Sequence, residues 1–442
     1  MNKRTADSIL DMKVNIVATN YSMVRHISQA KLTTEHLLSD RCDYAMILIQ
    51  TNTIFNMSKL EIESEGKLIS IPIKHPLKTS PKPVVFCVSP QFAAEQWQTF
   101  LAQVHISKFY GAYLHIYVLS MVESYFKLIR EYEKLGYLSI EPWLTIKFSK
   151  VDTPVMEPNR NVELRAQTAA HTDCLLMYKE AAKFIGSLDM DDLLIPVNSN
   201  SYYEEFEKQY NGNRLFSALN YLKHDFETIK SSNLEETSIL QMVKHAVPLF
   251  TNDTGKSFVL SERYNSTWAH WSRNADFLPQ FDENKQPYFT SLKYLNIGIF
   301  HLKKQKLIKN VKKLDGSRIP INPYDNKTKI INEENLNLIE KDLKSHLKLP
   351  QIKKLASSLP KEDFYMPIIF KCYNETFYHV RDQGVLDQSI LCINAYDCDL
   401  PQQDNLPCIH SDAFYHSGER MDPITYHFAT KPFFSRNIGC FQ

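Results

Sequence analysis

The sequence lacks several features that would place it in a class at once. It has no run of about 20 apolar residues, and the segment from Met1 to Ser22 shows neither a membrane span nor a secretion signal. It has no excess of either charge, with 51 Lys and Arg against 50 Asp and Glu, which argues against a general attraction to nucleic acid or anionic lipid. We also find no internal repeats, so partners have to be inferred from particular sites.

What the sequence does contain is apolar material for at least one large core. Of its 442 residues, 43% are hydrophobic and 12% are aromatic, which is an ordinary globular composition. The chain also has eight cysteines, and five of them crowd the final segment: Cys372, Cys392, Cys398, Cys408 and Cys440. This clustering predicts a tail tied by disulfides, although the spacing does not reveal which cysteines pair.

A zinc site is the alternative interpretation of the cysteine-rich tail, with Cys392, Cys398, Cys408 and His410 as ligands. Structural zinc sites usually present close pairs such as C-x₂₋₄-C, and the spacing here is looser, which favours disulfides. Six N-x-S/T sequons agree with an oxidising, secretory environment: Asn20, Asn56, Asn252, Asn265, Asn326 and Asn374.

The pattern along the chain predicts three regions. Residues 1–80 form a β-rich module that ends in the proline-rich segment Lys78–Pro83. Residues 81–350 alternate apolar strands with helices, which predicts an α/β fold with a mostly parallel, Rossmann-type sheet and helices on both faces. Residues 351–442 form a cysteine-rich segment packed on that region. The expected strands and helices of the α/β region are Val84–Val88, Glu95–Phe109, Tyr113–Leu119, Glu123–Leu135, Leu138–Pro142, Arg165–Lys183 and Phe184–Leu188.

An acidic loop follows the last of these strands directly, as Asp189-Met-Asp-Asp192. Ligands of such sheets bind at the carboxyl ends of the strands, so this loop lies where a ligand is expected. Two carboxylates two residues apart on an extended segment can face one way and suit Mn²⁺ or Mg²⁺. Asp189 and Asp191 are therefore the predicted metal ligands, whereas the similar Asp397-Cys-Asp399 follows no helix-strand unit.

Four further residues are candidates for donor or metal binding. Arg165 and Asp173 lie on the helix before the acidic loop and need not share a face. His270, in Trp268-Ala-His-Trp271, is the predicted third, nitrogen ligand of the metal, and His301 is a weaker candidate for the same role. The alternative for Arg165 is a solvated cation on the helix, for Asp173 an exposed carboxylate, and for His270 a side chain packed between the two tryptophans.

In combination, these segments resemble glycosyltransferase family 92, formerly domain of unknown function 23. The resemblance runs from about residue 45 to the end and is closest to nematode members. Its matching segments are Cys87-Val-Ser-Pro90 with Glu95-Gln-Trp97, Tyr132-Glu133 with Gly136, Glu141-Pro-Trp143, Arg165-Ala-Gln167, Asp173-Cys-Leu175 with Tyr178-Lys-Glu180, Asp189-Met-Asp-Asp192 with Pro196, and the ending with Cys372-Tyr373, Ile424-Thr-Tyr-His427 and Gly439-Cys440.

This resemblance implies a GT-A fold and an inverting, Mn²⁺-dependent transfer of a hexose, galactose in the relatives, from a UDP-sugar to an N-glycan or glycoprotein acceptor. It implies Golgi localisation and membrane association, although the membrane span of the family pattern is not seen in this sequence. Carried over residue by residue, Asp189 and Asp191 match the metal-binding acids. The predicted donor-binding residues are Ser89, Pro90, Arg165, Gln167, Asp173 and, in a second role, Asp189.

An inverting transfer also needs a carboxylate base, and the sequence does not select one among Asp225, Glu227, Glu235 and Glu236. Two other functions fit parts of the pattern. A haloacid-dehalogenase-like phosphohydrolase also ends a strand in Asp-x-Asp, but Asp192-Leu193 stands where a small hydroxyl residue is expected. A catalytically silent glycan-binding relative would keep the fold without the base.

Overall fold

In the computed structural model, the protein is described over these residues: 13–33, 42, 44–64, 66–147, 157–162, 164, 166–196, 199–210, 218–268, 270, 280–281, 287–288, 293–309, 311, 314, 318–321, 329–378, 392, 395–417, 427–436 and 440. Every absence noted below refers to these residues only.

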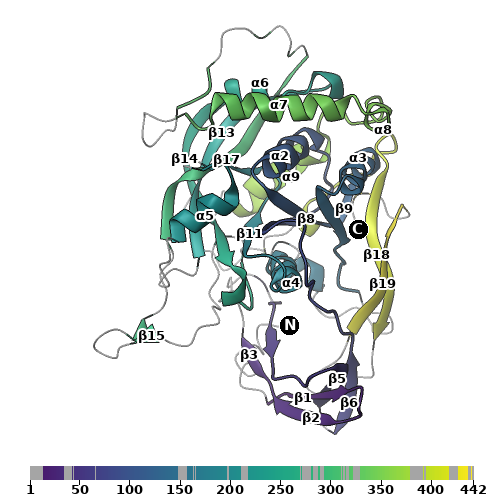
Figure 1. The fold of residues 1–442 in the computed structure, drawn as a ribbon. Helices are drawn as coiled ribbons and strands as arrows, with labels where there is room; N and C mark the ends of the chain where they lie inside the picture. Colours follow the sequence, from purple (N-terminus) through teal and green to yellow (C-terminus); the bar gives the residue numbers. More distant parts are fainter. Residues whose placement is uncertain are drawn as a thin grey trace.

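A mixed eight-stranded sheet forms the centre of the molecule, in the order β10-β8-β7-β11-β14-β13-β17-β12 (Figure 1). Neighbouring strands run parallel in four pairs and antiparallel in three. The first four, in spatial order 3-2-1-4, follow the Rossmann-type arrangement. This confirms the predicted α/β class. The strands are β7 (Val84–Gln91), β8 (Ala112–Val118), β10 (Leu138–Pro142), β11 (Phe184–Leu188), β12 (Asp192–Leu194), β13 (Ala218–Ser231), β14 (Val247–Leu260) and β17 (Lys293–Ile308).

Strands β7 and β11 lie side by side within the sheet and are buried, β7 over Val84–Val88 and β11 throughout, which explains why their sequences are largely apolar runs. Alternate residues of β7 enter different cores: Phe86 packs in the larger one and Cys87 in the smaller one. Between the strands, space is so tight that a Cβ on Gly186 of β11 would lie 2.3 Å from the ring of Phe258. Only glycine fits there without a shift of that ring.

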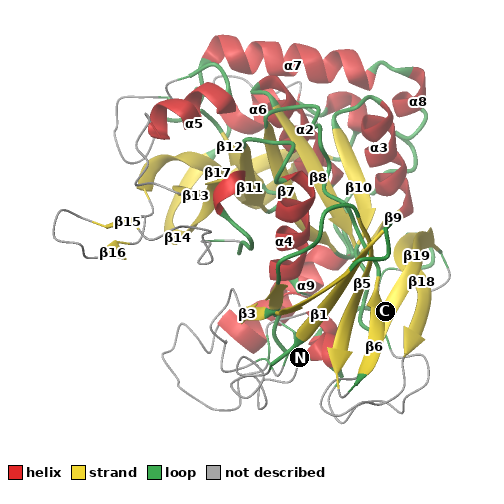
Figure 2. Ribbon diagram, turned by 60° about the horizontal axis from the view of Figure 1, so that its bottom comes forward, coloured by secondary structure: helices red, strands yellow, loops and turns green. Residues whose placement is uncertain are grey.

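Helices cover both faces of the sheet (Figure 2). One helix, α4 (Gln167–Tyr178), packs on the smaller core, and the others lie on the larger one. None of the described helices combines the length and the apolar character that a bilayer span requires. The helices on the larger core are α2 (Trp97–Phe109), α3 (Glu123–Lys134), α5 (Tyr202–Tyr210), α6 (Ile239–Lys244) and α7 (Glu333–Leu347).

Helix α3 shows how local sequence sets these elements. Its buried Tyr125, Leu128, Ile129 and Tyr132 recur at helical spacing and form one apolar stripe. The helix ends before Gly136, whose φ of +77° lies in the left-handed region that glycine adopts without strain. The chain can therefore turn at once into β10.

The first part of the chain forms small sheets apart from the central one, at the bottom of Figure 1. Four antiparallel strands lie in the order β2-β1-β5-β6, and β3 pairs with β4. The β-rich character predicted here is confirmed, and the boundary at residue 80 stays a prediction. These strands are β1 (Asn15–Asn20), β2 (Arg25–Gln29), β3 (Lys31–Thr33), β4 (Leu48–Gln50), β5 (Met57–Ser64) and β6 (Lys67–Ile71).

The C-terminal segment returns to the central region. Its strand β18 (Cys408–Ser417) pairs with β19 (His427–Ser435) and with the short β9 (Ser120–Val122). Short helices α8 (Pro350–Lys353) and α9 (Tyr365–Tyr373) precede it, and the buried carboxylate of Glu95 accepts the backbone N–H groups of Phe364 and Met366 at 2.8 Å each. Glu95 therefore anchors the start of α9 to the central region. Two-residue strands β15 (Gln280–Phe281) and β16 (Pro287–Tyr288) pair with each other.

All eight cysteines form disulfides: Cys42–Cys392, Cys87–Cys174, Cys372–Cys398 and Cys408–Cys440. The disulfide prediction is confirmed, and the alternative zinc site is wrong because its three cysteines are bonded to other cysteines. Only two of the four bonds lie within the tail. A third reaches back to Cys42, and the fourth joins β7 to α4 through the smaller core, which a count of cysteines could not reveal.

Candidate functional site

Sheet register brings the first two site residues together. Leu188 of β11 pairs with Val88 of β7, so the residues that follow, Asp189 and Ser89, emerge side by side at the carboxyl edge of the sheet. Ser89 donates its hydroxyl to Asp189 Oδ1 at 2.5 Å. The disulfide between Cys87 and Cys174 fixes α4 against the same strand, with its first residue next to this edge.

That first residue is Gln167, whose side-chain amide donates to the hydroxyl of Ser89 and to Asp189 Oδ1, the latter at 3.2 Å. The structure thus brings Ser89, Gln167 and Asp189 into one hydrogen-bonded group. Pro90 follows Ser89 within β7. Arg165 lies outside the described residues.

Asp173 belongs to a second group. It lies further along α4 and accepts the hydroxyl of Tyr117 at 2.6 Å and the ammonium group of Lys74 at 2.9 Å. Lys74 also donates to Glu141, at 2.8 Å. This places Asp173 at the ends of β8 and β10 and in a different set of contacts from Asp189.

The acidic loop itself is a tight turn. The backbone N–H of Asp192 donates to the carbonyl of Asp189 at 3.2 Å, and the Asp192 carboxylate accepts the N–H of Asp189 at 3.1 Å. Asp192 is fully buried, whereas the side chains of Asp189 and Asp191 are 34% and 33% exposed. The carboxylates of Asp189 and Asp191 can therefore contact a ligand that enters from solvent. The carboxylate of Asp192 holds the turn.

A histidine completes the candidate cation site. Asp191, Asp192 and His301 each offer an atom within 4.8 Å of the others. Strand β12 pairs with β17 so that Asp192 lies opposite His301, and His301 Nε2 is 3.1 Å from Asp191 Oδ2. The partly exposed Asp191 carboxylate and the His301 imidazole offer an oxygen and a nitrogen ligand that Mn²⁺ accepts.

Asp225 holds the other side of this imidazole. Its buried carboxylate lies 2.5 Å from His301 Nδ1. Burial alone would lower the pKa of His301, but the charge of Asp191 and hydrogen bonds to Asp191 and Asp225 outweigh it and raise the pKa to about 9. A carboxylate on the far nitrogen is the usual means of orienting a metal-binding histidine.

Two lysines lie against the acidic loop. Lys256 of β14 contacts Asp189 Oδ2 at 2.6 Å and Asp192 Oδ2 at 3.5 Å, and Lys223 of β13 lies 3.4 Å from Asp192 Oδ1. Burial would raise the pKa of Asp189, but the charges of Lys256 and Lys223 hold it well below its usual value. Sequence reasoning missed both lysines. The segments around both lysines mix polar and apolar residues, so no local pattern in the sequence marks either one.

His270 lies close by but is held differently. Its Nδ1 is 2.9 Å from the carbonyl oxygen of Gly255, and its ring packs edge-on to Trp268. Burial, followed by the charge of Lys256, lowers the pKa of His270. In the described part of the chain, the histidine that groups with the acidic loop is His301, which the sequence ranked second.

The four candidate bases separate in space. Asp225 lies in the site, bound to His301, and Glu227 lies two residues further along β13. Glu235 and Glu236 are in a 3₁₀ turn that precedes α6, where Glu235 Oε1 lies 3.8 Å from Lys353 Nζ. Asp397, from the second Asp-x-Asp motif of the sequence, lies in a short 3₁₀ turn beside the Cys372–Cys398 bond.

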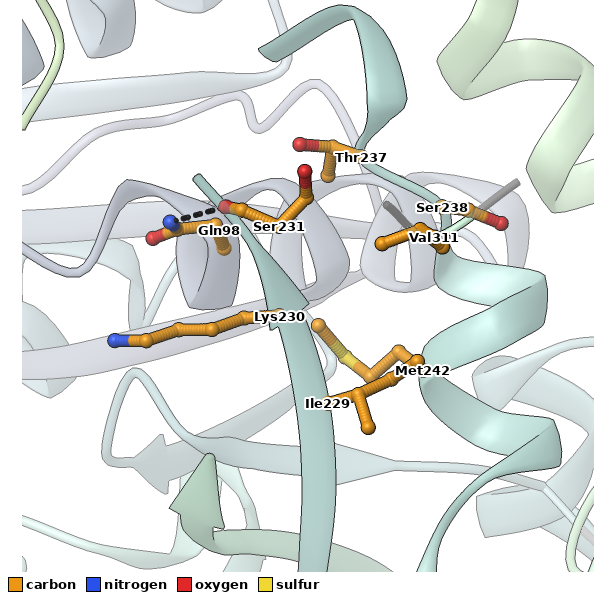
Figure 3. A pocket seen from close by; sticks show the side chains of 8 residues that line it. All are labelled: Gln98, Ile229, Lys230, Ser231, Thr237, Ser238, Met242 and Val311. Carbon is orange, nitrogen blue, oxygen red and sulfur yellow. Dashed lines mark hydrogen bonds between the residues drawn. The ribbon is translucent and has the colours of Figure 1, made fainter. Parts of the chain in front are cut away.

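A small pocket lies between the end of β13, the start of α6 and α2, and no residue of the acidic loop lines it (Figure 3). The space open to the centre of a water molecule is about 10 Å³, which suffices for roughly one water. The side chain of Gln98 donates to the carbonyl of Ser231 at 2.8 Å there. The pocket is too small for a nucleotide sugar. Its lining residues are Gln98, Ile229, Lys230, Ser231, Thr237, Ser238, Met242 and Val311.

Comparison with known proteins gives a consistent result. The sequence model of "Glycosyltransferase family 92" matches residues 82–347. The family 92 protein F55C10.4 of Caenorhabditis elegans is 60% identical over all of this chain and 86% of its own length. The family 92 protein ZK381.2 of the same organism is 42% identical over 91% of this chain and 77% of its own.

Among solved structures, the galactosyltransferase LgtC in complex with donor and acceptor sugar analogues is similar over 41% of this chain and 59% of its own. The sequence identity is 10% and the TM-score is 0.20, which is too low to support any argument about fold or function.

Proposed function

Since the chain belongs to glycosyltransferase family 92, and is therefore a glycosyltransferase with a sugar donor and a glycan acceptor, we propose a specific reaction for it. In this proposal it transfers a hexose, galactose, from a UDP-sugar to a glycan acceptor with inversion at the anomeric carbon. The reaction depends on a divalent cation, Mn²⁺. Membership of this family sets aside the phosphohydrolase alternative.

The observation that carries the cation proposal is the grouping of Asp191, Asp192 and His301 at the carboxyl edge of the sheet. Asp191 is the partly exposed carboxylate, and His301 is oriented by Asp225, so these two residues would hold the ion. When bound, a divalent cation supplies positive charge against the departing nucleotide diphosphate. The buried Asp192 would support the loop from behind.

The chain's own groups suit the donor side of the reaction. Ser89, Gln167 and Asp189 present a hydroxyl, an amide and a carboxylate from three different elements to one point. Such a convergent polar group can bind the hydroxyls of a sugar or ribose and orient the donor. We therefore keep Ser89, Gln167 and Asp189 as proposed donor-binding residues.

Asp225 is assigned to orientation rather than to proton abstraction. Its carboxylate is buried and lies 2.5 Å from His301 Nδ1 and 3.5 Å from Lys303 Nζ. A base must instead reach the acceptor hydroxyl from the face opposite the leaving group. The acceptor base of this proposal is left unassigned.

The test is a donor screen with purified protein. We expect hydrolysis of, or transfer from, UDP-galactose with Mn²⁺ and no turnover in EDTA. Asp191→Ala should remove the activity, and its melting curve should stay close to that of the wild type because the side chain is partly exposed. Full turnover in EDTA would refute the cation role. Binding of a glycan without turnover of any UDP-sugar would instead support the silent relative.

We propose further that the protein resides in the Golgi lumen. Four disulfides support an oxidising compartment. The sequon at Asn56 lies on an exposed turn beside Phe55, which is 86% exposed, whereas the Asn265 side chain accepts Lys179 Nζ at 2.5 Å. Protein isolated from its own cells should carry an N-glycan at Asn56, with lower occupancy at Asn265, by peptide mass spectrometry. Reduced cysteines and an unmodified Asn56 would contradict this localisation.

A further inference from the structure

The acidic loop already contains a cation of the protein's own. The ammonium group of Lys256 lies 2.6 Å from Asp189 Oδ2 and 3.5 Å from Asp192 Oδ2, and its side chain is 1% exposed. A buried ammonium group is stable only when it is paired, so these contacts hold Lys256 in place. The Lys256 ammonium group therefore neutralises part of the negative charge that would attract a divalent cation to this loop.

The backbone leaves Lys256 little freedom to move away. The preceding Gly255 packs so closely on β13 that an added Cβ would lie 2.3 Å from the carbonyl oxygen of Tyr221. On β13, Tyr221 pairs directly with Lys256. The lysine thus enters the site from a tightly packed pair of strands, which is the rigid placement expected of a group with a defined electrostatic role.

Lys223 neutralises more of the negative charge of the acidic loop. It is 7% exposed and lies 3.4 Å from Asp192 Oδ1. Asp189, Asp191, Asp192 and Asp225 give four negative charges. Lys223, Lys256 and Lys303, which lies 3.5 Å from Asp225 Oδ2, give three positive charges, so one negative charge remains when His301 is neutral. A divalent cation added to this loop gives a net positive charge, and only a further anion restores the balance. A nucleotide diphosphate is such an anion.

We propose that Lys256 is a resident counter-cation, which keeps divalent cation binding weak until a nucleotide diphosphate binds as well. This inference rests on the proposed function and adds an order to it: cation and donor bind together rather than one after the other. Buried charges interact strongly because water screens them little, so removal of one ammonium group should change cation affinity by at least about tenfold.

A purely structural role of Lys256 would give a different result. If Lys256 only stabilised the turn, its replacement would lower the melting temperature but leave the dependence of Mn²⁺ binding on nucleotide unchanged. The two roles are therefore separated by Mn²⁺ affinity measured with and without UDP. The loss of activity alone would not separate them.

The experiment titrates Mn²⁺ into the full chain and follows the free ion by electron paramagnetic resonance, in the presence and absence of UDP. Wild type should bind Mn²⁺ at least about tenfold more tightly with UDP. Lys256→Met should bind Mn²⁺ without UDP at least about tenfold more tightly than wild type, so that the effect of UDP shrinks. The control Lys230→Met breaks another buried lysine–carboxylate pair, with Asp363 at 2.5 Å and outside the acidic loop, and should behave as wild type.

Lys223→Met serves as a second variant in case Lys256→Met fails to fold, and it should shift Mn²⁺ affinity in the same direction. Unchanged Mn²⁺ affinity without UDP in the folded variants would overturn the inference and leave the proposed function standing. A wild type that binds no Mn²⁺ even with UDP would instead overturn the cation-dependent reaction itself. Tighter binding in both lysine variants, with the control unchanged, supports the counter-cation role.

Discussion

Replacement of Asp225 by Asn separates two roles that the same carboxylate could have. In the structure, the carboxylate accepts a hydrogen bond from His301 Nδ1 at 2.5 Å, which leaves Nε2 facing Asp191. An Asn side chain can donate its amide hydrogen to Nδ1 instead. The proton of a neutral imidazole then moves to Nε2, which is the wrong tautomer for a nitrogen ligand.

The size of the effect follows from the loss of an orienting partner. Such losses typically reduce metal affinity by about 10- to 100-fold, equivalent to about 1.4–2.8 kcal/mol. We expect Mn²⁺ affinity, measured with UDP by calorimetry, to fall by this amount in Asp225→Asn. Activity should recover toward the wild-type value when Mn²⁺ is raised to saturation, because the acceptor and donor sites are intact.

Glu227→Gln is the control for Mn²⁺ affinity, which it should leave unchanged, since it changes a carboxylate on the same strand two residues further along. Melting curves of both variants should be recorded to exclude unfolding as the cause. If Asp225→Asn kept wild-type Mn²⁺ affinity but lost activity at saturating Mn²⁺, the assignment would be refuted. Asp225 would then be a strong candidate for the acceptor base.

Two further predictions concern the frame around the site. Replacing Cys87 and Cys174 together by Ala should reduce the free energy of unfolding, measured by urea denaturation, by about 2–5 kcal/mol, because their disulfide closes a long loop between β7 and α4. An unchanged urea midpoint would show that packing alone holds α4. Burial raises the pKa of Glu95 to about 7, although backbone hydrogen bonds oppose this shift. The native state therefore binds the Glu95 proton more tightly than the unfolded chain does, and the free energy of unfolding should fall as pH rises from about 4.5 to about 7. Glu95→Gln should flatten that slope in unfolding midpoints recorded at pH 5 and pH 7.5, and identical slopes in both proteins would contradict this origin.

The elements of the α/β region were largely predictable from the sequence. The strand predicted over Phe184–Leu188 matches β11, and the helix predicted from Glu123 ends where Gly136 requires it. Burial on both faces makes such strands continuous apolar runs, and an amphipathic helix shows its stripe. By contrast, the helix predicted over Arg165–Lys183 is shorter, because the described α4 begins at Gln167 and ends at Tyr178.

The site was predictable only in part. The Asp189–Asp192 loop was found because a strand-end acidic motif is local in sequence. His301, Asp225 and Lys256 join it through β17, β13 and β14, which lie far along the chain, so their proximity depends on pairings that no local pattern encodes. The choice between His270 and His301 shows the same limit, since it depends on which strand pairs with β12.

The most direct test of the cation-dependent reaction is a crystal structure with Mn²⁺ and UDP, with the ion located by its anomalous scattering. The proposed site predicts one anomalous peak within bonding distance of the Asp191 carboxylate and of His301 Nε2. A structure with UDP bound and no anomalous peak at Asp191 would contradict it.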